Sequence, residues 1–273
     1  MPENVPSTME VSALLASAAL LGASVVSSLK RNRKFATRIL GWAGVAVGIG
    51  VLAYHAIGNG AWMPLEDNFD ALAALGLMLA ACVLYVQQTR PVGGLDLFVL
   101  PIAGLMLIAA AVFGTQLPKQ YAENAWSITH RFTAYSGALA LTVAGAIGAM
   151  YLVARRRLRS KNFSDGATFG SLERLESIAQ QLLVLGWSLF TIGLITGLLW
   201  GIHLSAHGAS EYRQFFNAKV MLALGVWIVY ALALHTPMTP SFRGRKAAVL
   251  SLIGLALMAG TLVAVQFMPG GKR

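Results

Sequence analysis

The chain has 273 residues, of which 56% are hydrophobic and only 12% are charged, whereas a typical soluble domain carries about 25% charged residues. No water-soluble fold of this length buries so much apolar surface, so the composition excludes an ordinary soluble protein and favours one embedded in lipid. The net charge of +10 does not indicate a nucleic acid partner, because the basic residues cluster in short gaps between apolar segments, where they act as orientation signals.

Eight apolar segments are long enough to cross a bilayer, which takes about 20 residues of α-helix. They predict an all-α, polytopic transmembrane helix bundle that forms one integral membrane domain over residues 1–273. The acidic N-terminus lacks the basic start of a cleavable signal peptide, so the first segment is expected to stay as a helix. The predicted spans are about 10–29, 39–57, 69–87, 95–114, 129–153, 179–203, 216–235 and 248–268.

Basic residues are unevenly divided between the two sides of these spans. Fifteen of the 21 Lys and Arg residues fall in gaps on one side, and the positive-inside rule places that side in the cytoplasm. Both termini are therefore expected on the outer side. The largest cytoplasmic gap, about 154–178, includes Ser171 followed by Glu173, which predicts a capped interfacial helix leading into the sixth span.

The sequence has few motifs of soluble enzymes. Its single cysteine, Cys82, lies within an apolar segment, so there is neither a CxxC motif nor a disulfide framework. Nucleophile-elbow, P-loop, zinc-protease and dinucleotide-binding motifs are also missing from the sequence. Any chemistry is therefore expected to depend on polar residues near the ends of the spans.

Ionisable groups inside a bilayer are costly, which makes each of them a functional candidate. Imidazole is a good iron ligand, and two histidines on facing helices can hold a haem. A histidine at a helix end is equally comfortable among lipid head groups, and Trp126 beside them fits either an aromatic belt or a macrocycle contact. Four histidines are predicted at the outer face and one at the cytoplasmic boundary: His55, His130, His203 and His207, and then His235.

An outer loop over residues 58–72 combines a turn at Pro64 with three carboxylates that end at Asp70. Paired carboxylates can bind a cation or orient the basic residues of a partner. A solvated acidic loop is the competing interpretation, and the sequence leaves both open.

Several features occur in a particular order over about residues 50–268. An outer Pro-Leu leads to an aromatic–acidic pair, a tryptophan precedes a histidine at the outer start of a helix, and a lysine, a tryptophan, a tyrosine and a Leu-His-Thr follow in turn. In this order the chain resembles the CcsA/ResC-type cytochrome c assembly proteins and their HemX-like and YpjD-like relatives. The matching residues are Pro64, Asp70, Trp126, His130, Lys219, Trp227, Tyr230 and His235.

The resemblance implies a haem-handling protein of a bacterial cytoplasmic (inner) membrane. Family members present haem at the outer face for attachment to apocytochrome c, and a membrane partner of the CcsB/ResB kind is implied. A b-type, non-covalent haem would be the cofactor. By position, His130 is similar to the outer axial ligand of the family and His235 to its membrane histidine.

Two features depart from the family pattern. The Trp-Asp signature expected before Lys219 is replaced by residues 203–219, where Tyr212 is one of three remaining aromatic residues, and no histidine follows the eighth span. The sequence therefore leaves open whether the chain belongs to a haem-attaching synthase, and His203 or His207 is the candidate replacement ligand. A HemX-like regulator of haem biosynthesis and a small-molecule permease are the alternative functions.

Overall fold

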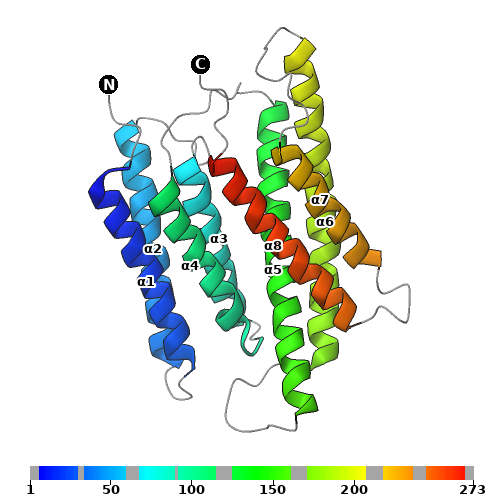
Figure 1. Ribbon diagram of the computed structural model, residues 1–273. Coiled ribbons are helices and arrows are strands. Elements are labelled where there is room, and N and C mark those ends of the chain that lie inside the picture. Colours follow the sequence, from blue (N-terminus) through cyan, green and yellow to red (C-terminus); the bar gives the residue numbers. More distant parts are fainter. Residues whose placement is uncertain are drawn as a thin grey trace. The chain divides into compact units, whose positions relative to one another are not determined.

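The protein, here a computed structural model, is all-helical in its described residues (Figure 1). The structure describes residues 6–29, 34–59, 68–89, 92–114, 125–160, 171–206, 218–235 and 244–267, without the side chains of 34, 59, 68, 203–206, 218–219 and 262–267. The eight helices match the eight predicted spans, which confirms the polytopic all-α fold. They are α1 (Thr8–Ser28), α2 (Lys34–Asn59), α3 (Asn68–Thr89), α4 (Leu95–Phe113), α5 (Ala125–Arg159), α6 (Leu172–Ala206), α7 (Ala218–His235) and α8 (Arg245–Phe267).

The surfaces of the helices suit a lipid environment. Six helices, α1 to α6, are long and apolar enough to cross a membrane, and α7 adds the shorter apolar stretch Val220–His235. Large apolar side chains face outward on several of them; Phe35, Ile57 and Phe132 are 79%, 77% and 69% exposed. Such exposure is costly in water but favourable against acyl chains.

The predicted cytoplasmic interfacial helix lies only partly within the described residues, since 161–170 are outside them. Ser171 caps α6 as expected, with its hydroxyl oxygen accepting the backbone N–H of Arg174 at 3.3 Å. From Leu172 the helix runs on to Ala206. Residues 172–178 are therefore the first turns of the same helix that carries the sixth span.

Contacts divide the chain into two compact units, a subdivision that the sequence analysis does not anticipate. The N-terminal unit contains α1 to α4 and the C-terminal unit contains α5 to α8. In each unit, every helix packs against its neighbours in sequence and the first helix packs against the fourth. Each unit is thus an antiparallel four-helix bundle.

In the N-terminal unit, small residues bring α1 and α2 together. The hydroxyl of Ser17 donates to the carbonyl of Gly44 at 2.7 Å, and that of Ser24 donates to the carbonyl of Thr37 at 2.8 Å. A Cβ on Gly44 would lie 3.1 Å from the Ser17 carbonyl oxygen. Small and hydroxylated residues commonly join helices in membranes because they permit close approach and supply hydrogen bonds.

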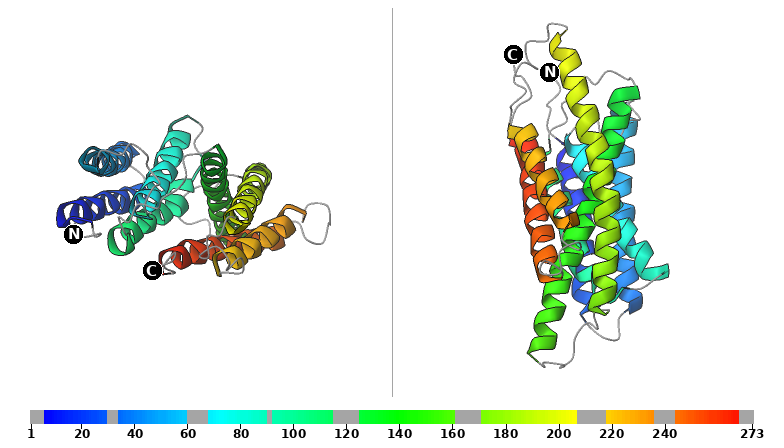
Figure 2. Two further views of the ribbon diagram at one scale, coloured as in Figure 1. Left: turned by 90° about the horizontal axis from the view of Figure 1, so that it is seen from above. Right: turned by 90° about the vertical axis from the view of Figure 1, so that its right-hand side faces the viewer.

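In the C-terminal unit, α5 and α6 lie side by side, and α7 and α8 cover one side of that pair (Figure 2). Tyr230 of α7 is fully buried at the centre. Its hydroxyl donates to the carbonyl of Leu141 in α5 at 3.1 Å. Its ring lies over Gly254 of α8, where a Cβ would be 2.6 Å from the ring. One side chain therefore joins three of the four helices.

Candidate functional site

Two glycines of α6 determine how closely His130 of α5 packs against that helix. A Cβ on Gly197 would be 2.6 Å from Cε1 and 2.9 Å from Nδ1 of the His130 ring, so the imidazole rests on bare helix backbone. One turn earlier, a Cβ on Gly193 would be 2.9 Å from Cα of Ala134. The two helices approach closely at this level because α6 has no side chain there.

A hydrogen bond fixes which nitrogen of His130 carries the proton. Nδ1 lies 2.7 Å from the carbonyl oxygen of Gly193. The hydroxyl of Thr196 lies 3.1 Å from the same oxygen but closer, at 2.8 Å, to the carbonyl oxygen of Ile192. A carbonyl oxygen only accepts, so Nδ1 must be the protonated nitrogen. In the neutral ring the lone pair is then on Nε2. Histidines that bind metals commonly have this arrangement, in which the distal N–H donates to a carbonyl.

The surroundings of His130 are open on one side. The histidine itself is half-buried. Trp126 lies four residues earlier on α5 and is 52% exposed, and residues four apart share one face of a helix. The indole of Trp126 is thus exposed on the same helix face as the His130 imidazole, one turn nearer the N-terminal end of α5.

His235 lies at the opposite end of the C-terminal unit from His130. The side-chain amide of Gln180 donates to the carbonyl of Leu234 at 3.3 Å, so His235 stands at the level of Gln180. Gly197, which contacts His130, is about 25 Å further along α6 at 1.5 Å per residue. These two histidines therefore cannot bind one iron. His235 is exposed, and its Nδ1 donates to the carbonyl of Ala231 at 2.7 Å.

Trp227 joins α7 to α6. Its ring stacks on that of Trp187 with centroids 5.3 Å apart, and its indole N–H donates to the hydroxyl of Thr191 at 2.9 Å. In return, the indole of Trp187 donates to the backbone carbonyl of Trp227 at 3.3 Å. The contacts of Trp227 thus hold α7 against α6, between the levels of His235 and His130.

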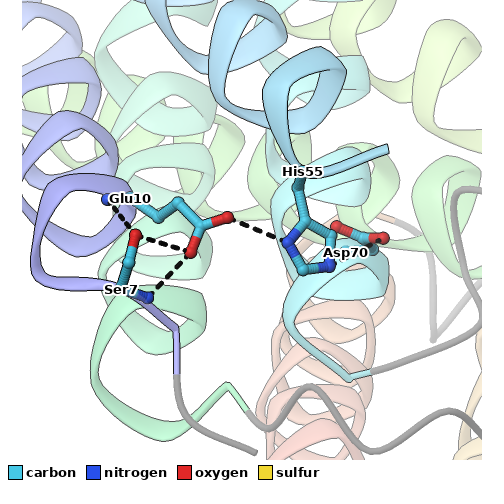
Figure 3. A network of polar contacts seen from close by, with 4 residues as sticks. All are labelled: Ser7, Glu10, His55 and Asp70. Atoms are coloured by element: carbon cyan, nitrogen blue, oxygen red, sulfur yellow. Dashed lines mark hydrogen bonds and ion pairs between the residues drawn. The ribbon is translucent and has the colours of Figure 1, made fainter. Parts of the chain in front are cut away.

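His55 belongs to a separate polar cluster in the N-terminal unit (Figure 3). Its Nδ1 lies 2.9 Å from Oε1 of Glu10, and its Nε2 lies 3.9 Å from Oδ2 of Asp70. All three residues are at least 92% buried. Asp70 thus points into the bundle, and we name these three residues the Glu10–His55–Asp70 cluster.

The other candidate residues are described in part or not at all. His203 and Lys219 lie in α6 and α7, and nothing is described of their side chains. The backbone of His203 is about 9 Å beyond Gly197 toward the end of α6. Pro64, His207 and Tyr212 lie outside the described residues. Within the described parts of the chain, no three His, Cys, Asp or Glu side chains are arranged to hold a metal ion.

Sequence reasoning missed two kinds of residue. Glu10 was overlooked because it precedes the region of recognised motifs and lies 45 residues from His55. Gly193 and Gly197 of α6 were not singled out either. Their spacing of four residues on a span, opposite a predicted histidine, is a signal that points to a close helix contact.

Comparison with known proteins places the chain among assembly factors. The family described as "Cytochrome C assembly protein" matches residues 50–270. "Cytochrome c biogenesis protein CcsA" of a Prochlorococcus marinus strain is 23% identical over 238 residues, which cover 75% of this chain and 73% of the relative. The protein of the same name from Synechococcus sp. (strain CC9605) is 25% identical over 236 residues, with 75% of each chain covered.

Proposed function

The chain belongs to the cytochrome c assembly protein family, and on that premise we propose that it handles haem with His130 as an iron ligand at the outer face. The relatives named above are cytochrome c biogenesis proteins, so the process served is cytochrome c assembly. The single observation that carries the proposal is the hydrogen bond from His130 Nδ1 to the Gly193 carbonyl, because it leaves the Nε2 lone pair for a metal.

The residues around His130 fit a haem better than a bare metal ion. The porphyrin supplies four nitrogens, so the protein needs to contribute only one or two axial ligands. This agrees with a site that has one ligand-ready histidine and no clustered metal-binding side chains among the described residues. The exposed Trp126 offers a flat apolar surface on the same helix face. When bound, such a haem supplies the group that is to be transferred.

The chain's own residues have three tasks in this proposal. The carbonyl of Gly193 holds the His130 proton on Nδ1. Gly197 makes room for the ring. The haem would be b-type and non-covalent, and His203 or His207, which the charge asymmetry predicts on the same side of the membrane, would supply the second ligand. A separate site at His235, about 25 Å away along α6, would serve the cytoplasmic end.

Membership of the family supports a proposal for the localisation and the partners. We propose that the protein resides in a bacterial cytoplasmic membrane, with apocytochrome c as the acceptor and a CcsB/ResB-like protein as the membrane partner. The sequence between His203 and Lys219 lacks the Trp-Asp pair of the family. This observation favours a HemX-like regulatory role as the second candidate function.

The test is to purify the protein with its haem and compare two histidine variants. His130→Ala should insert stably but lose haem or change the iron spin state, and added imidazole should partly restore the wild-type absorption spectrum. His235→Ala is the matched control at the other end of the unit and should leave the low-spin features of the outer site in place. Wild-type haem content and spectrum in His130→Ala, with loss of both in His235→Ala, would refute the outer site.

A further inference from the structure

Three helix ends meet at the Glu10–His55–Asp70 cluster, and each carries the charge that suits it. Glu10 is in the first turn of α1 and Asp70 in the first turn of α3. Carboxylates are stabilised there by the positive end of the helix dipole. His55 lies near the C-terminal end of α2, four residues before Asn59, where a positive charge is stabilised. The helices therefore favour two carboxylates around one cation.

The hydrogen bonds of Glu10 indicate which ring nitrogen of His55 carries a proton. Oε2 of Glu10 accepts the backbone N–H of Ser7 at 2.7 Å and the Ser7 hydroxyl at 2.9 Å. Oε1 is thus directed at His55, whose Nδ1 donates to it at 2.9 Å (Figure 3). Since a carboxylate with these donors is ionised, Nδ1 of His55 is protonated.

The second nitrogen of His55 also faces a carboxylate. Nε2 is 3.9 Å from Oδ2 of Asp70, and both side chains are buried. A bare lone pair on Nε2 would be directed at negative charge in a low-dielectric site, whereas a second proton turns the contact into an ion pair. The charged side chains described on the other parts of this unit, Arg38 on α2 and Asp96 on α4, lie at the opposite helix ends.

We propose that His55 is held as a doubly protonated imidazolium between Glu10 and Asp70, and that this charged cluster is a latch that fastens α1 to α2 and α3. The inference concerns the N-terminal unit and does not depend on haem binding at His130. An imidazolium has no lone pair for iron, so His55 is not an axial ligand. A macrocycle bound at Nε2 would also have to fit into the 3.9 Å gap to Asp70.

The first experiment reads the protonation state directly in the wild-type protein. With ¹⁵N-labelled histidine at neutral pH, one ring should give the signals of an imidazole protonated on both nitrogens. His55→Gln should remove those signals, and His235→Gln, at an exposed helix end, should leave them unchanged. A His55 ring that is neutral at neutral pH would overturn the proposal without any variant having to fold.

The second experiment measures coupling and iron binding. Glu10→Gln and His55→Gln should each lower the unfolding midpoint by about 5 °C or more, since each breaks a buried pair. The double variant should lose clearly less than the two single losses added together. Additive losses, or a well-folded His55→Gln that has lost its haem, would refute the latch.

Discussion

Replacing Gly197 with alanine should displace the His130 ring while leaving the imidazole itself in the protein. The added Cβ would lie 2.6 Å from Cε1 of the ring, so the imidazole has to move by about 0.8 Å to regain an ordinary contact of 3.4 Å. A movement of this size breaks or weakens the 2.7 Å hydrogen bond to Gly193. One lost hydrogen bond costs about 1 kcal/mol and overpacking costs about 1–3 kcal/mol, against a gain of up to about 1 kcal/mol from helix propensity.

We therefore expect Gly197→Ala to lose about 1–3 kcal/mol of stability, or about 2–12 °C in unfolding midpoint, together with a smaller fraction of low-spin haem. Gly225→Ala on α7 is the matched control, because a Cβ there meets nothing within 4 Å. In a His130→Ala background the ring is gone, so the same Gly197→Ala change should become harmless. Thermal unfolding in detergent measures the loss of stability in each background, and the absorption spectrum measures the fraction of low-spin haem. An equal loss in the two backgrounds would refute the steric reasoning.

Three further expectations concern other parts of the chain. Tyr230→Phe should lower the unfolding free energy by about 0.5–1.5 kcal/mol, because the hydrogen bond from the Tyr230 hydroxyl to the buried Leu141 carbonyl is lost; an unchanged thermal midpoint would contradict this. The charge asymmetry predicts sidedness, which reporter fusions test, and a cytoplasmic C-terminus would break the eight-span arrangement. Reporters should be cytoplasmic after Lys34, within 158–168 and near Arg245, and outer near Asn59, Lys119, Ser210 and the C-terminus. Because residues 203–219 lack a Trp-Asp pair, the protein alone should not restore cytochrome c assembly in a strain without the full synthase, and efficient complementation would show that its aromatic residues suffice.

The helices were predictable from the sequence because their signal is local. Apolar length alone defines each span, and the predicted fourth span of about 95–114 differs by one residue from α4 at Leu95–Phe113. The longer helices were underestimated, since α5 extends to Arg159 beyond its apolar part. The prediction missed the polar residues at this end because hydropathy measures the fit to lipid and not the tendency to form a helix.

The roles of the histidines were not predictable in the same way. His55 and His130 look alike in sequence, each near a span end on the side predicted to be outer. The structure separates them through residues far along the chain, since His55 meets a carboxylate 45 residues away and His130 meets a carbonyl 63 residues away. Only packing between helices decides whether an imidazole faces a carboxylate or a backbone oxygen.

The Glu10–His55–Asp70 cluster also constrains how the chain is made. Glu10 is synthesised 45 residues before His55 and about 60 before Asp70, which corresponds to about 2–9 s and about 3–12 s of translation at 5–20 residues per second. During that interval α1 enters the membrane with a carboxylate whose histidine does not yet exist. Ser7 directly precedes α1, and its backbone N–H and hydroxyl donate to Oε2 of Glu10, so these local bonds can form while the ribosome is still producing α2. The contact with His55 can form only after α2 has been made, and Asp70 completes the cluster once the start of α3 has followed.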